Sequence, residues 1–292
     1  MDESSENNSP TRDRVLRGIT SDDNFRVICA TTSELVRGAI ATQGIDGETA
    51  QHFGNLMTGT VLIRQTMSPD YRVQSVMKGA GGRGTLVADS HPSGMTRGIV
   101  ELPSDVDTFK IGQGSALQLM RSMAQGKMFR SVVEPPPDGT VAQGLMTYLQ
   151  ESEQIVSVIR TGVAWRNGEL LHAGGFVVQL LPDAARGALM IMTERLEALA
   201  PADKFLVDVG GCAKRMLDEL LYGIEYAQLD DQSVYHGCNC SRETVVGALA
   251  TVSPDEIKEM LKEDEIIELS CDYCKTNYQL GHAQLSGMLE SS

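Results

Sequence analysis

Near its C-terminus the chain reads HGCNCSRE over residues 236–243 and CDYC over residues 271–274, which gives the spacing C-x-C-x30-C-x2-C. Four thiolates placed about 2.3 Å from one ion complete a closed tetrahedral site and leave no position for a substrate water. Soft, anionic sulfur also selects zinc over magnesium or calcium. The spacing therefore predicts one Zn²⁺ per chain, held by Cys238, Cys240, Cys271 and Cys274.

The residues around these cysteines predict a small zinc-binding module over residues 237–292. A helix is expected to start at Ser241, and Ser253-Pro254-Asp255-Glu256 is a capping box with proline at the first helical position. Two strands are expected, at Ile266 to Leu269 and at Tyr278 to Leu280. Because the module is so small, metal is expected to contribute much of its stability.

Two alternative interpretations of the cysteines stay open: four free structural thiols, or two disulfides in an oxidising compartment. The paired spacing, with helix capping between the pairs, favours metal. His236 is close enough in sequence to suggest itself as a ligand, but four cysteines already fill the site.

Upstream of the module, helical and strand patterns are interleaved. Ser33 is expected to cap a short helix that Gly44 closes, and a second helix is expected to follow. Glycine-rich and Pro-Ser-Gly breaks then separate three expected antiparallel strands, at residues 71–78, 85–89 and 96–101.

A proline-rich turn at residues 135–139 precedes an expected helix over residues 141–152. Two strand-like runs follow, at residues 155–165 and 170–181. Asn167-Gly168 between them predicts a tight hairpin, because both residues tolerate positive φ.

These elements lack the regular alternation of a parallel sheet, so the sequence predicts an α+β fold, with a mixed helix and antiparallel-sheet domain over residues 1–183. Residues 1–14 are polar and acidic and are expected to form a flexible tail. From residue 184 to residue 236, leucines and methionines recur at helical spacing, interrupted by Pro201 and Gly210-Gly211. This pattern predicts a helical linker that needs a partner surface to bury its apolar face.

Composition argues against several classes of partner. The 292 residues carry a net charge of −14, which repels phosphate backbones and anionic lipids, so neither nucleic acid nor membrane is expected as a partner. No apolar run approaches the length of a membrane span, and the N-terminal residues lack the features of a signal peptide. The protein is therefore expected to be cytoplasmic, where clustered cysteines favour metal.

Three other features are interpreted as structural. Residues 79–84 match G-x-G-x-x-G, but a strand pattern rather than a helix follows, so a tight turn is expected. Asp89-Ser90-His91 holds the residue types of a catalytic triad, yet consecutive side chains cannot easily take that geometry. Cys29 and Cys212 are expected to be small apolar side chains in the core. No catalytic residue is predicted.

The cysteine segments also carry a resemblance to a known family. The stretch from His236 to Glu243, Asp264-Glu265 before the second pair, and the CDYC segment followed by Tyr278 resemble the C-terminal signature of the heat-shock protein 33 family, the redox-regulated holdase chaperones. Met77-Lys78-Gly79, Thr96-Arg97-Gly98 and residues 148–154 are similar to that family's N-terminal domain. This sequence departs from the family's pattern in the N-terminal tail, in the additional residues Cys29 and Cys212, and in the Gly-Arg-Gly sequence of the glycine turn.

The resemblance implies an ATP-independent chaperone, not an enzyme, that binds unfolded or partly folded client proteins under oxidative and heat stress. It implies that oxidation joins Cys238 to Cys240 and Cys271 to Cys274, that zinc leaves, and that the chain forms a homodimer on activation.

Two functions of other classes stay open. One is a thiol-disulfide oxidoreductase that uses the Cys271-x-x-Cys274 pair. The other is a zinc-dependent adaptor for nucleic acid or protein, although the acidic charge argues against nucleic acid.

Overall fold

The computed structural model describes residues 13–123, 126–249 and 266–281. The chain divides into two compact units, Met1–His236 and Gly237–Ser292. Most of the expected tail lies outside the described residues, but Asp13 is buried and Arg14 already begins a strand, so the tail does not extend to residue 14 as predicted. The predicted division into three domains stays a prediction.

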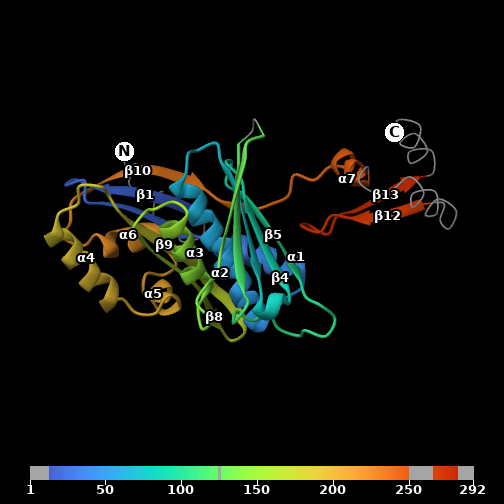
Figure 1. The fold of residues 1–292 in the computed structure, drawn as a ribbon, viewed down its shortest axis with the longest axis horizontal. Coiled ribbons are helices and arrows are strands. Elements are labelled where there is room, and N and C mark those ends of the chain that lie inside the picture. Colours follow the sequence, from blue (N-terminus) through green and yellow to red (C-terminus); the bar gives the residue numbers. More distant parts are fainter. Residues whose placement is uncertain (1–12, 124–125, 250–265, 282–292) are drawn as a thin grey trace, which may run out of the picture. The chain divides into compact units, whose positions relative to one another are not determined.

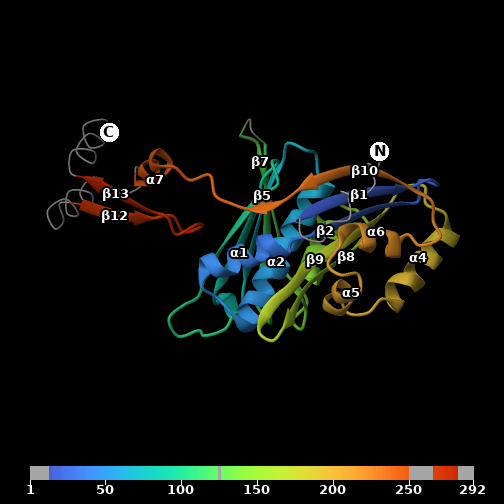
Figure 2. The same cartoon turned by 180° about the vertical axis from the view of Figure 1, so that it is seen from behind.

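Two sheets form the frame of the first unit (Figures 1 and 2). A five-stranded sheet has the order β10-β1-β2-β9-β8, and a six-stranded sheet has the order β11-β5-β4-β3-β6-β7. Neighbouring strands are antiparallel except β11 and β5, which are parallel. The strands are β1 (Arg14–Thr20), β2 (Phe25–Thr31), β3 (Arg72–Lys78), β4 (Thr85–Ser90), β5 (Met95–Glu101), β6 (Ala116–Ser122), β7 (Met128–Val133), β8 (Ser157–Arg166), β9 (Glu169–Leu180), β10 (Tyr226–Ser233) and β11 (Tyr235–His236).

Three helices belong to the core that both sheets share: α1 (Ser33–Gln43), α2 (Gly47–Thr66) and α3 (Val141–Glu151). Helix α2 touches strands of both sheets, which explains why 14 of its 20 residues are buried. The core includes Phe53, Leu62, Met77 and Leu145, all with no exposed surface. The expected α+β fold built on antiparallel hairpins is confirmed.

Three further helices cover the five-stranded sheet: α4 (Arg186–Ala198), α5 (Ala202–Asp208) and α6 (Ala213–Leu220). Their buried face, with Met192, Leu206, Met216 and Leu217, packs on sheet residues such as Phe176 in a second core. The helical pattern of the linker is thus confirmed as far as residue 220.

The predicted linker needs one correction at its C-terminal end. Residues 226–233 are not helical: they form β10, which pairs with β1. Strand β10 is largely exposed and polar, so it lacks the alternating apolar residues that predict a strand. Hydrogen bonds to β1 and the Arg14–Asp231 ion pair hold it there instead.

The predicted turns of the first unit are confirmed, but one helix cap is wrong. Asn167 and Gly168 close the β8–β9 hairpin with φ of 54° and 82°. The glycine turn at residues 79–84 joins β3 to β4 through the short 3₁₀ helix η2 (Ala80–Gly82). Ser33, however, does not cap α1, because its hydroxyl hydrogen-bonds with the Ala173 backbone. The buried carboxylate of Asp13 accepts the Leu35 N–H instead.

The second unit contains helix α7 (Arg242–Leu249) and a hairpin of β12 (Ile266–Ser270) and β13 (Asn277–Gly281). The predicted helix start and both predicted strands are confirmed. The Ser253–Glu256 capping box lies outside the described residues.

Candidate metal centre

Two short segments of the second unit position the four cysteines. Cys238 and Cys240 lie directly before α7, whose first turn is fixed by Ser241: its hydroxyl accepts the Thr244 N–H at 3.2 Å. Arg242 donates to the Gln279 carbonyl and so ties this helix start to β13.

Cys271 and Cys274 occupy the tight turn between β12 and β13. The Lys275 N–H donates to the Cys271 carbonyl at 2.7 Å, and the Thr276 carbonyl accepts the Cys271 N–H at 3.0 Å. Lys275 takes a left-handed conformation, with φ of 59°, which turns the chain back into β13. The hairpin thereby places both sulfurs on one turn.

The structure brings the four predicted ligand residues together. Their Sγ atoms all lie within 4.8 Å of one another, with 3.8 Å between Cys238 and Cys271 and 3.3 Å between Cys240 and Cys274. Four sulfurs about 2.3 Å from a common centre would be separated by about 3.8 Å along each edge of a tetrahedron. The donor set and its spacing therefore fit one tetrahedral Zn²⁺, and these four residues could hold it.

Hydrogen bonds give the sulfurs unequal acidity. Burial raises the pKa of Cys274, but the hydroxyl and N–H of Thr276 stabilise the thiolate and lower its pKa to about 7. The Tyr278 hydroxyl, 3.1 Å from Cys240, lowers the pKa of that cysteine, but burial and the other three sulfurs outweigh it and raise it to about 12. Four thiolates so close together repel one another unless a cation lies between them.

His236, Cys29 and Cys212 do not belong to the cysteine cluster. His236 ends the first unit in β11, and its ring lies against Gly38 of α1; within the part of the chain that the structure describes, the metal-binding group contains only cysteines. Cys29 is fully buried, as predicted, and burial raises its pKa. Cys212 is only half-buried and precedes α6 as its N-cap residue, so its predicted core role holds in part.

Thr276 and Lys275 were missed by sequence reasoning. Both directly follow the second cysteine pair, so a closer reading of the residues after Cys274 could have singled out a hydroxyl near the sulfur.

Asp89, from the apparent triad, forms ion pairs with Arg72 and Arg97 and approaches His91 at 3.3 Å. Burial raises the pKa of Asp89, but the hydrogen bonds from His91 and Arg72 and the charge of Arg72 hold it low. This carboxylate therefore belongs to an ion-pair network and does not activate a nucleophile. No described helix is both long enough and apolar enough to span a membrane.

Comparisons with known proteins agree over nearly the whole chain. The family model described as Hsp33 protein matches residues 13–281. A protein named 33 kDa chaperonin from Syntrophotalea carbinolica is 30% identical over 289 residues, covering 95% of this chain and 99% of its own length. A protein of the same name from Thermus thermophilus is 29% identical, covering 94% of this chain and 86% of its own length.

A solved structure supports the same fold. The crystal structure of the 33 kDa chaperonin from Thermotoga maritima, a heat shock protein 33 homolog, covers 96% of this chain and 98% of its own, with a TM-score of 0.81 and 23% identity. With the family model matching from Asp13 to Gly281 and relatives similar along almost their full length, this chain belongs to the Hsp33 family.

Proposed function

We propose that this protein is an ATP-independent holdase chaperone, kept inactive by a zinc-bound cysteine cluster and activated when those cysteines are oxidised. The observation that carries the proposal is the group of four Sγ atoms within 4.8 Å of one another in the small second unit. The names of its relatives, 33 kDa chaperonin, support the chaperone function.

In the reduced state, Cys238, Cys240, Cys271 and Cys274 hold the ion as thiolates. Zinc, when bound, supplies a double positive charge that keeps four thiolates together. Structural zinc contributes about 10–16 kcal/mol of apparent binding energy, whereas a whole domain is stable by about 5–15 kcal/mol. The described part of the second unit is one helix and a two-stranded hairpin, a combination with little stability of its own.

Oxidation of the cysteines to disulfides removes the thiolates that hold the zinc ion. One thiolate attacks peroxide and becomes a sulfenic acid with release of hydroxide, and a neighbouring thiol then displaces water from it to form a disulfide. As each disulfide forms, its two cysteines give up two electrons to one peroxide, so two peroxide molecules oxidise all four cysteines. The pairing Cys238–Cys240 and Cys271–Cys274 remains part of the proposal, because all four sulfurs lie close enough to react. Loops this short constrain the unfolded chain little, so the disulfides do not restore the fold.

The linker helices supply the surface for clients. In α4, α5 and α6, the buried apolar side chains face the five-stranded sheet. Leu189, Met190 and Ile191 of α4 are already 40%, 65% and 56% exposed. We infer that loss of the metal-held fold frees these helices, and flexible methionine and leucine side chains then bind unfolded clients and a second copy of the chain.

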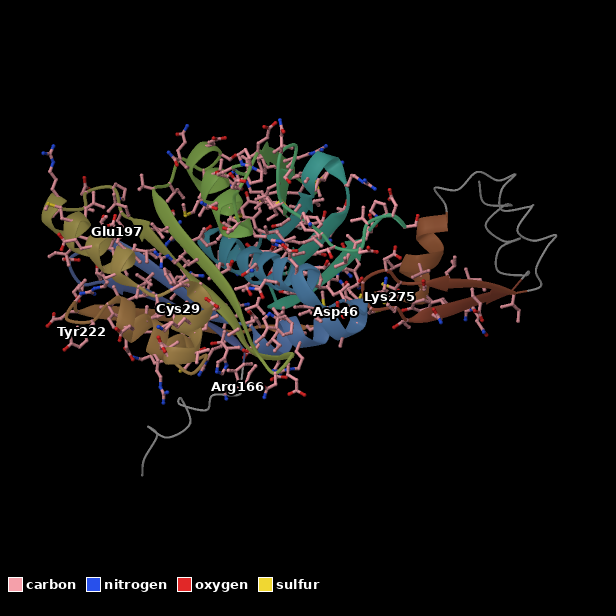
Figure 3. The ribbon with its side chains drawn as sticks, turned by 90° about the horizontal axis from the view of Figure 1, so that it is seen from below. Cys29, Asp46, Arg166, Glu197, Tyr222 and Lys275 are labelled. Atoms are coloured by element: carbon pink, nitrogen blue, oxygen red, sulfur yellow. The ribbon has the colours of Figure 1, made fainter. Side chains whose placement is uncertain are left out.

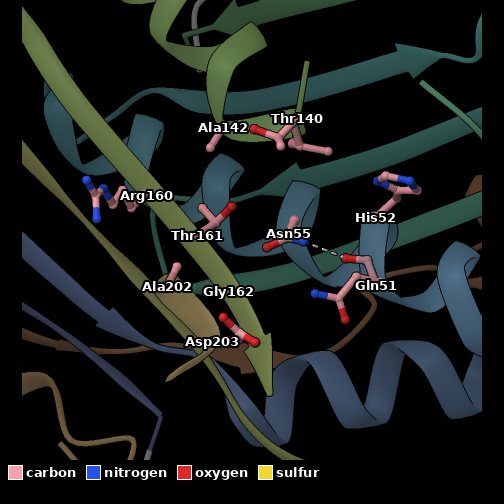
Figure 4. A pocket seen from close by; sticks show the side chains of 11 residues that line it. Gln51, His52, Asn55, Thr140, Ala142, Arg160, Thr161, Gly162, Ala202 and Asp203 are labelled. Atoms are coloured by element: carbon pink, nitrogen blue, oxygen red, sulfur yellow. Dashed lines mark hydrogen bonds between the residues drawn. The ribbon is translucent and has the colours of Figure 1, made fainter. Parts of the chain in front are cut away.

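Helix α5 packs closely against strand β8 at Gly162. A Cβ atom on Gly162 of β8 would lie 2.8 Å from the Ala202 carbonyl carbon and 2.9 Å from Asp203 N. Ala202 and Asp203 form one wall of a cavity of about 380 Å³ between α2, α3 and β8, and Figure 4 shows them next to Gly162. Because the backbone of α5 packs directly against the backbone of β8 at this point, even a small displacement of either segment disturbs the contact.

Suppression of client aggregation tests the proposal. Protein treated with peroxide at elevated temperature should reduce light scattering by a heat-unfolding client, without ATP, whereas the reduced zinc-bound protein should not. Equal suppression of aggregation by the oxidised and the reduced protein would show that oxidation does not switch the activity.

One observation favours a second candidate, a thiol-disulfide oxidoreductase using Cys271 and Cys274. The pKa of Cys274, lowered to about 7 by Thr276 against the effect of burial, is typical of a reactive thiol. This function predicts catalytic reduction of insulin disulfides and substoichiometric zinc. A holdase should show neither.

A further inference from the structure

A second cavity, of about 560 Å³, lies between the α1–α2 turn and the tip of the β8–β9 hairpin. This volume is within the range of about 300–1,000 Å³ that is usual for ligand sites. Ile40, Ile45 and Trp165 give it apolar walls, and Trp165 is 37% exposed. Asp46 and Glu48 also line it, and both are exposed. An apolar cavity therefore opens beside two carboxylates.

The exposed indole is held in place. Trp165 Nε1 donates a hydrogen bond to the side-chain oxygen of Gln51 on α2. This bond satisfies the one polar atom of the indole, so the exposed part of the ring is available to apolar or cationic partners.

The two carboxylates are not neutralised by nearby cations. Glu48 lies 3.7 Å from His52, but burial lowers the pKa of His52, so its imidazole is neutral at pH 7. Asp46 precedes α2 without capping it, and none of the ion pairs among the described residues includes it. Both negative charges thus remain available to a ligand.

We propose that this cavity binds a segment of an unfolded client in which a Lys or Arg lies next to a large apolar residue. The apolar side chain enters between Ile45 and Trp165, and the cation meets Asp46 and Glu48. The net charge of −14 also draws basic segments toward the protein. The inference rests on the proposed chaperone function but names a site outside the linker helices, since no residue of α4 to α6 lines this cavity.

The chain has a single tryptophan, so its fluorescence reports on this cavity alone. The test titrates two peptides of equal length without aromatic residues, one alternating Leu and Lys and one alternating Leu and Glu, into the reduced, zinc-loaded full chain. In this state the cavity is open, whereas the apolar faces of α4 to α6, which the proposed function requires for client protection, stay buried. Only the Leu–Lys peptide should shift the Trp165 emission, and the shift should saturate. The double variant Asp46→Asn with Glu48→Gln should weaken binding by about threefold to tenfold, because two exposed ion pairs are lost.

The matched control is Asp138→Asn with Glu134→Gln, which removes the same charge. Both residues are exposed, and neither lines this cavity nor belongs to α4, α5 or α6. Figure 3 shows Asp46 beside the blue helices α1 and α2. Affinity, followed by anisotropy of labelled peptide, should stay at the wild-type value in this control.

Equal weakening in the two double variants would mean that only the overall charge attracts the peptide, and it would overturn the proposal. So would peptide binding that leaves the Trp165 emission unmoved. Failure of the chaperone function is a separate outcome: it would appear as unchanged client aggregation after oxidation, an assay that does not involve these peptides.

Discussion

Each of the four clustered cysteines offers one ligand atom to a metal ion, and the group found among the described residues contains no histidine or carboxylate that could replace it. Cys271→Ser should therefore abolish tight zinc binding, because a serine hydroxyl stays protonated at neutral pH and cannot act as the fourth thiolate. Zinc released to a chromophoric chelator should fall from one per chain to nearly none.

Cys212→Ser is the matched control for that measurement. Cys212 precedes α6 as an N-cap residue without a side-chain hydrogen bond, and serine is favoured at this position. Zinc content should remain at one per chain. A Cys271→Ser protein that kept its zinc would contradict the assignment of the ligands.

Asp13 gives a prediction about pH at the same scale. It is 6% exposed, and burial raises its pKa to about 6, although the N–H groups of Leu35, Glu34 and Ser33 lower it. A raised pKa means that the folded state binds the proton more tightly than the unfolded state. The stability from this group is therefore complete below about pH 4 and is lost as the pH rises through 6, by about 2–3 kcal/mol.

Asp13→Asn should remove this dependence, because an amide does not titrate and its oxygen can still accept the Leu35 N–H. In urea unfolding, the stability of the variant relative to wild type should rise by about 2–3 kcal/mol between pH 4 and pH 7. The exposed Asp183→Asn should show little such change. A constant difference between Asp13→Asn and wild type would refute the prediction.

Sequence reasoning succeeded at the residue scale where a few neighbouring residues determine the outcome. The cysteine spacing was enough to predict which four sulfurs gather. It failed for the cap of α1, where Ser33 has the right residue type but hydrogen-bonds with Ala173, and Asp13 takes the capping role from 22 positions away. Only tertiary structure reveals such a contact.

Among the elements, the position of α5 on β8 depends on Gly162. In Gly162→Ala the added methyl would meet backbone atoms of Ala202 and Asp203, which cannot rotate away. The variant should lose about 1–3 kcal/mol and release part of the linker from the sheet. Reduced, zinc-bound protein should then bind more of a hydrophobic fluorescent dye.

Gly187→Ala on α4 serves as its control, because a Cβ at this position meets no atom within 4 Å. It should leave dye binding at the wild-type level and can stabilise the helix by up to about 1 kcal/mol. If Gly162→Ala bound no more dye than Gly187→Ala, the linker would not be held at this contact.

Helices and strands whose apolar residues recur at a regular spacing could be predicted from the sequence, and elements without such a spacing could not. Helices α1 to α6 and the hairpin at Asn167-Gly168 follow from local patterns. Strand β10 does not, because its exposed, polar residues give no alternation and only the pairing with β1 makes it a strand. Strands β1, β2, β6 and β7 also went unpredicted, although Cys29 of β2 was expected in the core.

For the whole molecule, the pattern of disulfides after oxidation is a separate prediction. Cys238–Cys240 and Cys271–Cys274 should be the main pairs once the metal-held fold is lost, since sequence neighbours then meet most often. Proteolysis under non-reducing conditions, followed by mass spectrometry, identifies the linked peptides. A majority of bridges between the two segments, such as the neighbouring Cys240 and Cys274, would contradict this pairing.

The central claim concerns metal, sulfur and activity in the same molecules, so counting zinc and free thiols through a peroxide titration tests it most directly. The reduced chain should contain one zinc, and its release should accompany the loss of four thiols and the onset of client protection. Cys29, fully buried, should stay reduced. Purified protein that is folded without metal, or that protects clients while all four thiols remain, would contradict the account.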